Sequence, residues 1–163
     1  MATFRDTIGY EKESAATGIV SAAKSLMAYV KQIVTLLLTN TQTATTTEDL
    51  NQAAGTYDLL TGTTQPVMLE TLSFKMPDVD ISGGSLTSIT IQTDDTTPQV
   101  VFNSGDGALA NLTQEAELSF TGAIRINVGT KLQLTIAGGA AGTACAATIT
   151  AGYKAIVAGG TLA

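Results

Sequence analysis

The chain has 163 residues and a net charge of −6, because 14 Asp and Glu residues outnumber 8 Lys and Arg residues. It contains no histidine and one cysteine, which excludes Ser-His-Asp catalysis, His-ligated metals, an internal disulfide and a CxxC zinc site. The acidic balance argues against nucleic acid as a partner, and we expect neither enzyme activity nor a cofactor.

The N-terminal residues match neither a secretory signal nor a membrane span. Charged residues from Arg5 to Glu13 precede the first apolar run, unlike the order found in a signal peptide. The apolar run itself, Ile19–Leu38, contains Lys24 and Lys31, which a spanning helix would bury at high cost. We therefore expect no membrane association.

Residues 1–40 carry the clearest periodicity, because their apolar positions alternate at spacings of 3 and 4 over about three heptads. The predicted oligomer interface consists of Ala16, Ile19, Ala23, Leu26, Val30, Ile33 and Leu37. The flanking heptad positions hold apolar side chains such as Val20 and Met27, where two-stranded coils usually hold charges. The pattern predicts an N-terminal arm and a trimeric coiled-coil-like helix, although a helix that packs on its own domain or docks on another protein needs the same stripe.

Residues 41–55 have no apolar period and are dense in threonine, so we interpret them as a linker. From residue 56 the hydrophobic period changes to two, and Gly, Asp and Ser clusters separate short apolar segments. The predicted strands are Thr56–Leu60, Val67–Lys75, Ser85–Thr93, Gln99–Asn103, Ala116–Phe120, Ala123–Val128, Lys131–Ala137 and Ala146–Val157. This pattern predicts an antiparallel β-sandwich or jelly-roll domain over residues 56–163, and its small side chains favour burial through oligomerisation.

Few residues are candidates for site chemistry. Asp78 and Asp80 alternate on an extended segment before a glycine turn and are weak candidates for a hard-cation site, although carboxylates at a solvated strand edge fit as well. Asp94-Asp95 and the segment 103–107 are interpreted primarily as turn residues and only secondarily as possible metal ligands. We therefore predict no metal site.

Two further side chains are interpreted as packing residues. Cys145 lies between alanines with no basic neighbour in the sequence, so we predict a buried, unreactive thiol. Tyr153 is predicted to pack at the edge of the β domain, with contact to a glycan as the alternative.

The succession of helix, Thr-rich segment and small-residue β domain, with segments 118–122 and 148–154, resembles bacteriophage capsid decoration (cement) proteins and short head fibres. The resemblance implies a homotrimer on the outer surface of the virion that binds the major capsid protein and stabilises an icosahedral shell. A receptor- or glycan-binding fibre tip is the alternative, although the predicted loops hold few aromatic residues. A self-assembling shell or pilus subunit is a third interpretation.

Overall fold

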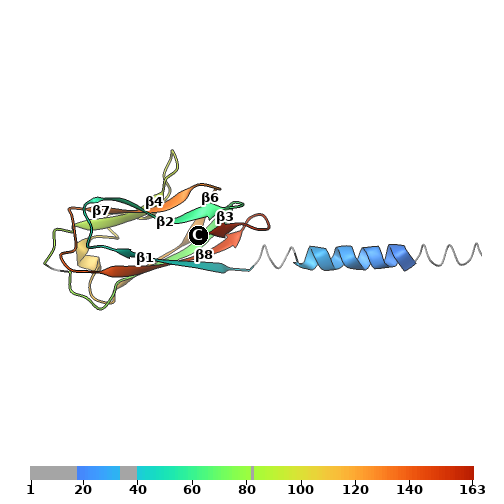
Figure 1. The fold of residues 1–163 in the computed structure, drawn as a ribbon, viewed down its shortest axis with the longest axis horizontal. Coiled ribbons are helices and arrows are strands. Elements are labelled where there is room, and N and C mark those ends of the chain that lie inside the picture. Colours follow the sequence, from blue (N-terminus) through green and yellow to red (C-terminus); the bar gives the residue numbers. More distant parts are fainter. Residues whose placement is uncertain (1–17, 34–39, 82) are drawn as a thin grey trace, which may run out of the picture. The chain divides into compact units, whose positions relative to one another are not determined.

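A computed structural model describes residues 18–33, 40–81 and 83–163. Residues 18–33 form one helix, and the remaining described residues form a β domain with a single turn of 3-10 helix (Figure 1). The chain divides into two compact units between Leu37 and Leu38, and each unit is described here by itself.

The described residues of the β domain form nine strands, most of which carry the alternating burial expected when one face of a sheet is covered. The strands are β1 Gln42–Asp49, β2 Gly55–Thr63, β3 Val67–Lys75, β4 Ser88–Thr93, β5 Val100–Phe102, β6 Glu117–Ile126, β7 Lys131–Ala137, β8 Ala146–Ala155 and β9 Thr161–Leu162, with the helical turn η1 Leu109–Asn111 between β5 and β6.

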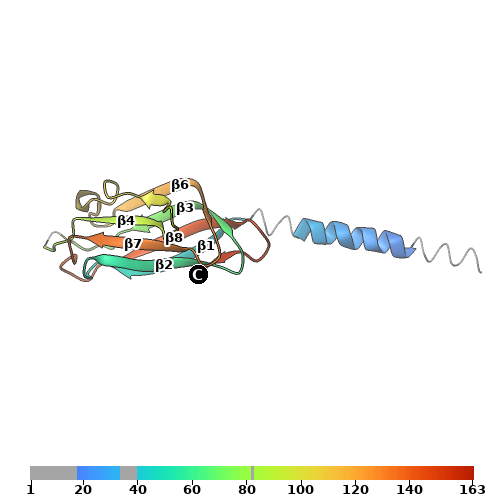
Figure 2. The same cartoon turned by 90° about the horizontal axis from the view of Figure 1, so that it is seen from above.

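The strands form two sheets, with orders β1-β8-β3-β6 and β5-β4-β7-β2-β9. Every pair of neighbouring strands is antiparallel. The chain changes sheet at every connection except the one between β4 and β5, so the two sheets are interleaved along the sequence. Figures 1 and 2 show the sheets as two layers that face one another. The expectation of a mainly β, antiparallel domain after an N-terminal helix is confirmed.

The inner faces of both sheets supply one buried cluster. Leu132, Leu134 and Ile136 alternate along β7 and are at most 1 % exposed, while Leu72 and Phe74 of β3 belong to the same cluster. Burial of such side chains is worth about 1.5–3 kcal/mol each. The period of two in the sequence therefore accounts for these core positions, whereas Leu50, which is fully buried, lies in the segment predicted as a linker.

The prediction of a linker is wrong for most of its length. Residues 42–49 form β1, which pairs with β8 in an unbroken register from Gln42 opposite Tyr153 to Asp49 opposite Ala146. The strand lies at the edge of its sheet and its inner positions are only half-buried, so it needs no apolar alternation. Threonine favours extended backbone, and the Thr-rich run is therefore strand sequence.

A second correction concerns Ala116–Phe120 and Ala123–Val128, which were predicted as separate strands, because the break between them, at residues 121 and 122, lies within β6. The register between β3 and β6 shifts between Leu69 and Thr71, and this irregularity accommodates the glycine. A side chain at Gly122 would meet the ring of Phe120, at 2.4 Å from its Cζ atom. The glycine thus allows the ring to lie over the backbone of the same strand.

Candidate functional site: an interaction surface

The N-terminal helix presents an apolar stripe that a single helix cannot bury. Within residues 18–33, Ile19 is 70 % exposed, Leu26 63 %, Val30 50 % and Ile33 40 %, and Ala23 is also exposed. These five residues recur every three or four positions, so they share one face of the helix. The exposed side chains make this face a candidate for contact with another chain.

The stripe is wider than a two-residue heptad seam. Val20, Met27 and Tyr29 flank it and are 52 %, 72 % and 62 % exposed. Two further members of the predicted oligomer interface, Ala16 and Leu37, lie outside the described residues. The assignment of the seven positions to an oligomer interface stays a prediction.

The outer face of the β1-β8-β3-β6 sheet is covered by hydroxyl groups. Its four strands place Thr45, Thr150, Ser73 and Ser119 in one row across the sheet. Within this row the Oγ1 atoms of Thr45 and Thr150 are 3.3 Å apart. Beside the row, Ser73 donates a hydrogen bond of 2.5 Å to the carboxylate of Glu117. The centre of this face is therefore polar, with hydroxyl groups in the row and one carboxylate bonded to it.

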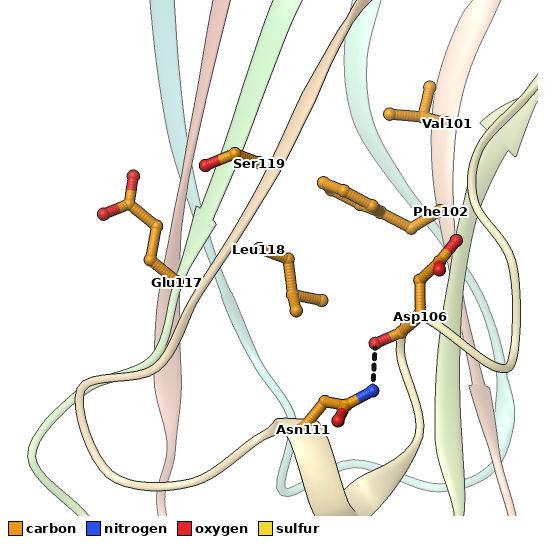
Figure 3. Close-up of a pocket in the computed structure, with 7 residues that line it drawn as sticks. All are labelled: Val101, Phe102, Asp106, Asn111, Glu117, Leu118 and Ser119. Carbon is orange, nitrogen blue, oxygen red and sulfur yellow. Dashed lines mark hydrogen bonds between the residues drawn. The ribbon is translucent and has the colours of Figure 1, made fainter.

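A groove lies on the side of the β domain where the edge strands β5 and β6 face one another (Figure 3). Its volume is about 350 Å³. Phe102 and Leu118 point toward one another across it, while Glu117 and Ser119 point away from it (Figure 3). On the rim, the side-chain amide of Asn111 donates a 3.0 Å hydrogen bond to the backbone carbonyl of Asp106. The groove therefore lies beside the edge of β6 that has no neighbouring strand among the described residues, and most of its exposed lining is polar.

The structure does not build a metal site around the carboxylates predicted as weak cation ligands. Asp78 and Asp80 are both exposed, and Asp78 accepts a 3.2 Å hydrogen bond from the side-chain amide of Gln114. Across the described parts of the chain, no three His, Cys, Asp or Glu side chains are grouped so that they could hold a metal ion.

The side chains of the segments 94–95 and 103–107 stabilise loops through hydrogen bonds. Asp94 accepts a 2.7 Å hydrogen bond from the backbone N–H of Lys131, and Asp95 accepts one of 3.0 Å from the hydroxyl of Thr130. The side-chain carbonyl of Asn103 accepts hydrogen bonds from two backbone N–H groups of its own loop, at 2.7 and 3.1 Å. These contacts agree with the interpretation of both segments as turns.

One ion pair crosses the outer face of the second sheet. Asp58 of β2 pairs with Lys131 of β7 and also accepts a 2.7 Å hydrogen bond from Gln133. The hydrogen bond from Lys131, followed by that from Gln133, lowers the pKa of Asp58, and the same pair raises the pKa of Lys131. Both groups are solvated, so the pair contributes little to stability.

Cys145 and Tyr153 are packing residues, as predicted. Cys145 is fully buried, and its burial, with a smaller effect from the Asp49 carboxylate, raises the pKa of its thiol. Tyr153 is 3 % exposed, and its hydroxyl lies 3.4 Å from the side-chain carbonyl of Gln42. Neither side chain is available to a ligand.

No protein-family model matches the chain, and no curated protein is similar to it in sequence. A chain of the capsid structure of Helicobacter pylori bacteriophage KHP30 is 10 % identical with a TM-score of 0.48, over 76 % of this chain and 92 % of that chain. A chain of the Ralstonia phage GP4 capsid is 15 % identical with a TM-score of 0.46, over 72 % and 86 %. A chain of the VP2 subviral particle of infectious bursal disease virus is 14 % identical with a TM-score of 0.40, over 70 % of this chain and 33 % of that chain. Similarity at this level establishes neither a family nor a function.

Within the described residues, no helix has both the length and the apolar character needed to cross a membrane.

Proposed function

We propose that the chain is a non-enzymatic structural protein of a virion, which binds the outer surface of an icosahedral capsid as a homotrimer and stabilises it. The observation that carries the proposal is the exposed apolar stripe on a helix that belongs to the same chain as a two-sheet β domain. A helix of this kind serves to associate with other chains, and the β domain then supplies a folded head.

The strand orders support a jelly-roll assignment of the β domain. Apart from β9, which adds to β2, the eight strands form two sheets of four, in the orders β1-β8-β3-β6 and β5-β4-β7-β2, and the chain changes sheet at every connection between them except the one from β4 to β5. A jelly roll consists of eight antiparallel strands in two sheets, and viral capsid and lectin domains commonly use it. Fold alone does not determine function, so the helix is needed for the proposal.

The width of the stripe supports three chains in preference to two. Ile19 and Ile33 occupy d positions of the predicted heptads, and isoleucine at d favours trimers and tetramers over dimers. Val20 and Met27 at the flanking positions add exposed apolar surface that a third helix would cover. In the proposal, residues 1–40 form the trimer core and the contact with the major capsid protein.

The charge distribution supports an outward-facing β domain. Residues 56–163 hold nine of the 14 acidic residues and four of the eight basic ones. A net negative head resists association with other heads on a crowded surface. The β domain therefore faces solvent in the proposal, while the nearly neutral N-terminal part contacts the shell.

Immunogold electron microscopy with antibodies raised against the purified full-length chain tests the proposal. We expect gold particles spread over the whole shell of intact virions of the source virus. Labelling confined to a tail or a single vertex, together with blocked adsorption of virions by the purified protein, would favour the receptor-binding fibre tip. Absence of the protein from purified virions would refute both. On the β domain, the exposed large apolar side chains that the structure describes are all aliphatic, which weighs against a glycan site.

A further inference from the structure

Two edges of the hydroxyl-covered sheet are open to another strand. In the order β1-β8-β3-β6, strands β1 and β6 are each hydrogen-bonded on one side only within the described residues. They are also long, with 8 and 10 residues respectively. Unpaired N–H and C=O groups along such an edge form a template for another strand.

Over residues 42–47 the β1 edge lacks the features that usually prevent pairing. This part of the strand, QTATTT, contains no charged residue and no proline, and its register with β8 has no bulge. Natural edge strands are commonly protected by charges, proline or bulges, or by being short. The charged residues of β1, Glu48 and Asp49, are confined to its last two positions, so the preceding six residues offer a regular edge to another strand.

The β6 edge leaves apolar side chains only partly covered. Leu118 and Phe120 are half-buried and pack against the core from the end of the sheet, beside the groove of about 350 Å³. A strand added to this edge would lay its inward side chains over Leu118 and Phe120. The inward positions near the middle of β1 are Ala44 and Thr46, which are small enough for this space.

Symmetry and strand direction determine which edges can meet. In a cyclic trimer every contact joins two different surfaces of the chain, so β1 cannot pair with its own copy. An antiparallel sheet of four strands has edges that run in opposite directions. When copies are related by rotation about an axis along the strands, β1 of one copy therefore meets β6 of the next in the antiparallel sense.

We propose that β1 of one copy pairs with β6 of a second copy, so that the four-stranded sheets of neighbouring subunits continue as one antiparallel sheet. This inference rests on the homotrimer of the proposed function. If the outer, hydroxyl-bearing faces of the two sheets join into one face, Thr43, Thr45 and Thr47 of β1 lie beside the exposed residues of β6. A slip of one residue would turn the inward side chains of β1 to the face opposite Leu118 and Phe120. The register between β1 and β6 can therefore shift only by an even number of residues.

Disulfide trapping in the full-length chain tests the pairing. Directly opposite residues of antiparallel strands have Cα atoms about 4.5–5.5 Å apart, which suits a disulfide. When twisted sheets join into a closed ring, the hydrogen-bond register between neighbouring strands is staggered. The test therefore includes several possible registers between β1 and β6. Each variant combines one cysteine from the β1 set with one from the β6 set: Thr43→Cys, Thr45→Cys or Thr47→Cys with Glu117→Cys, Ser119→Cys or Thr121→Cys.

We expect at least one combination to give covalent dimers and trimers on non-reducing gels after mild oxidation. Within one chain β1 and β6 are separated by two strands, roughly 14 Å, so a disulfide here joins different copies. The matched control is Thr46→Cys with Ser119→Cys, whose side chains lie on opposite faces and which should stay uncrosslinked. Cys145 is buried in every variant and does not contribute.

The native mass of each reduced variant separates the two proposals. If the reduced protein is a trimer and no combination crosslinks above the control, the edge pairing is wrong and the homotrimer stands. If the reduced wild type is a monomer at micromolar concentration, the homotrimer is wrong and the edge pairing falls with it.

Discussion

Replacement of Leu26 by aspartate tests the apolar stripe of the helix. Leu26 is 63 % exposed in the single chain, so its remaining surface is available for burial between chains. Full burial of a leucine side chain is worth about 1.5–3 kcal/mol, and burial of this fraction about 1–2 kcal/mol per copy. Summed over three copies, the free energy of trimer association weakens by about 3–6 kcal/mol. Burial of an unpaired carboxylate in the apolar seam adds a further cost.

A loss of this size raises the overall dissociation constant of the trimer about 100- to 10,000-fold, since 1.4 kcal/mol corresponds to a factor of ten. Sedimentation velocity over a concentration series measures the change. The matched control is Ser21→Asp, which adds the same charge on the opposite face of the helix and should stay trimeric. An unchanged Leu26→Asp trimer, or equal dissociation of both variants, would refute the assignment of the stripe to the interface.

Three further predictions concern the β domain. Gly138 has φ +84° and an added Cβ would lie 2.3 Å from a backbone carbonyl, so Gly138→Ala should lower the free energy of unfolding by more than about 1 kcal/mol, measured by urea denaturation. Gly83→Ala, where an added Cβ meets nothing within 4 Å, is the control and should be nearly neutral. Asp58 has a lowered pKa in the folded state, so its small stabilisation is present above its ordinary value of 3.8 and is lost as pH falls through the folded pKa. Thermal melts at stepped pH should show a shallower acid loss for Asp58→Asn than for wild type, and equal slopes would contradict the role of the ion pair. Added Ca²⁺ should leave the melting temperature unchanged, and a rise of several degrees that Asp78→Asn with Asp80→Asn abolishes would overturn the prediction of no metal site.

The sequence predicted the strands whose inner positions are fully apolar. Val67–Lys75 and Lys131–Ala137 have the bounds that were expected, because alternation of large apolar and polar side chains is a local signal. The edge strand β1 was missed because Ala44 and Thr46, its inner residues, bury little apolar surface. Its threonine content was the signal that could have identified it.

The candidate surfaces were predictable in different degrees. The helix stripe follows from heptad spacing alone, and Leu26 and Val30 lie on the predicted face. The hydroxyl row and the groove depend on which strands are neighbours, since Thr45 and Ser119 are far apart in the sequence and three pairing registers separate them in the sheet. Such non-local pairing has no signature in a single sequence, so neither surface could be predicted.

Saturation binding of the purified full-length chain to virus shells prepared without it tests the central claim most directly. Co-sedimentation followed by quantification of bound protein measures the number of copies on each shell. We expect saturable binding, a copy number divisible by three, and loss of binding in Leu26→Asp but not in Ser21→Asp. No saturable binding of the wild-type protein to the shells would contradict it.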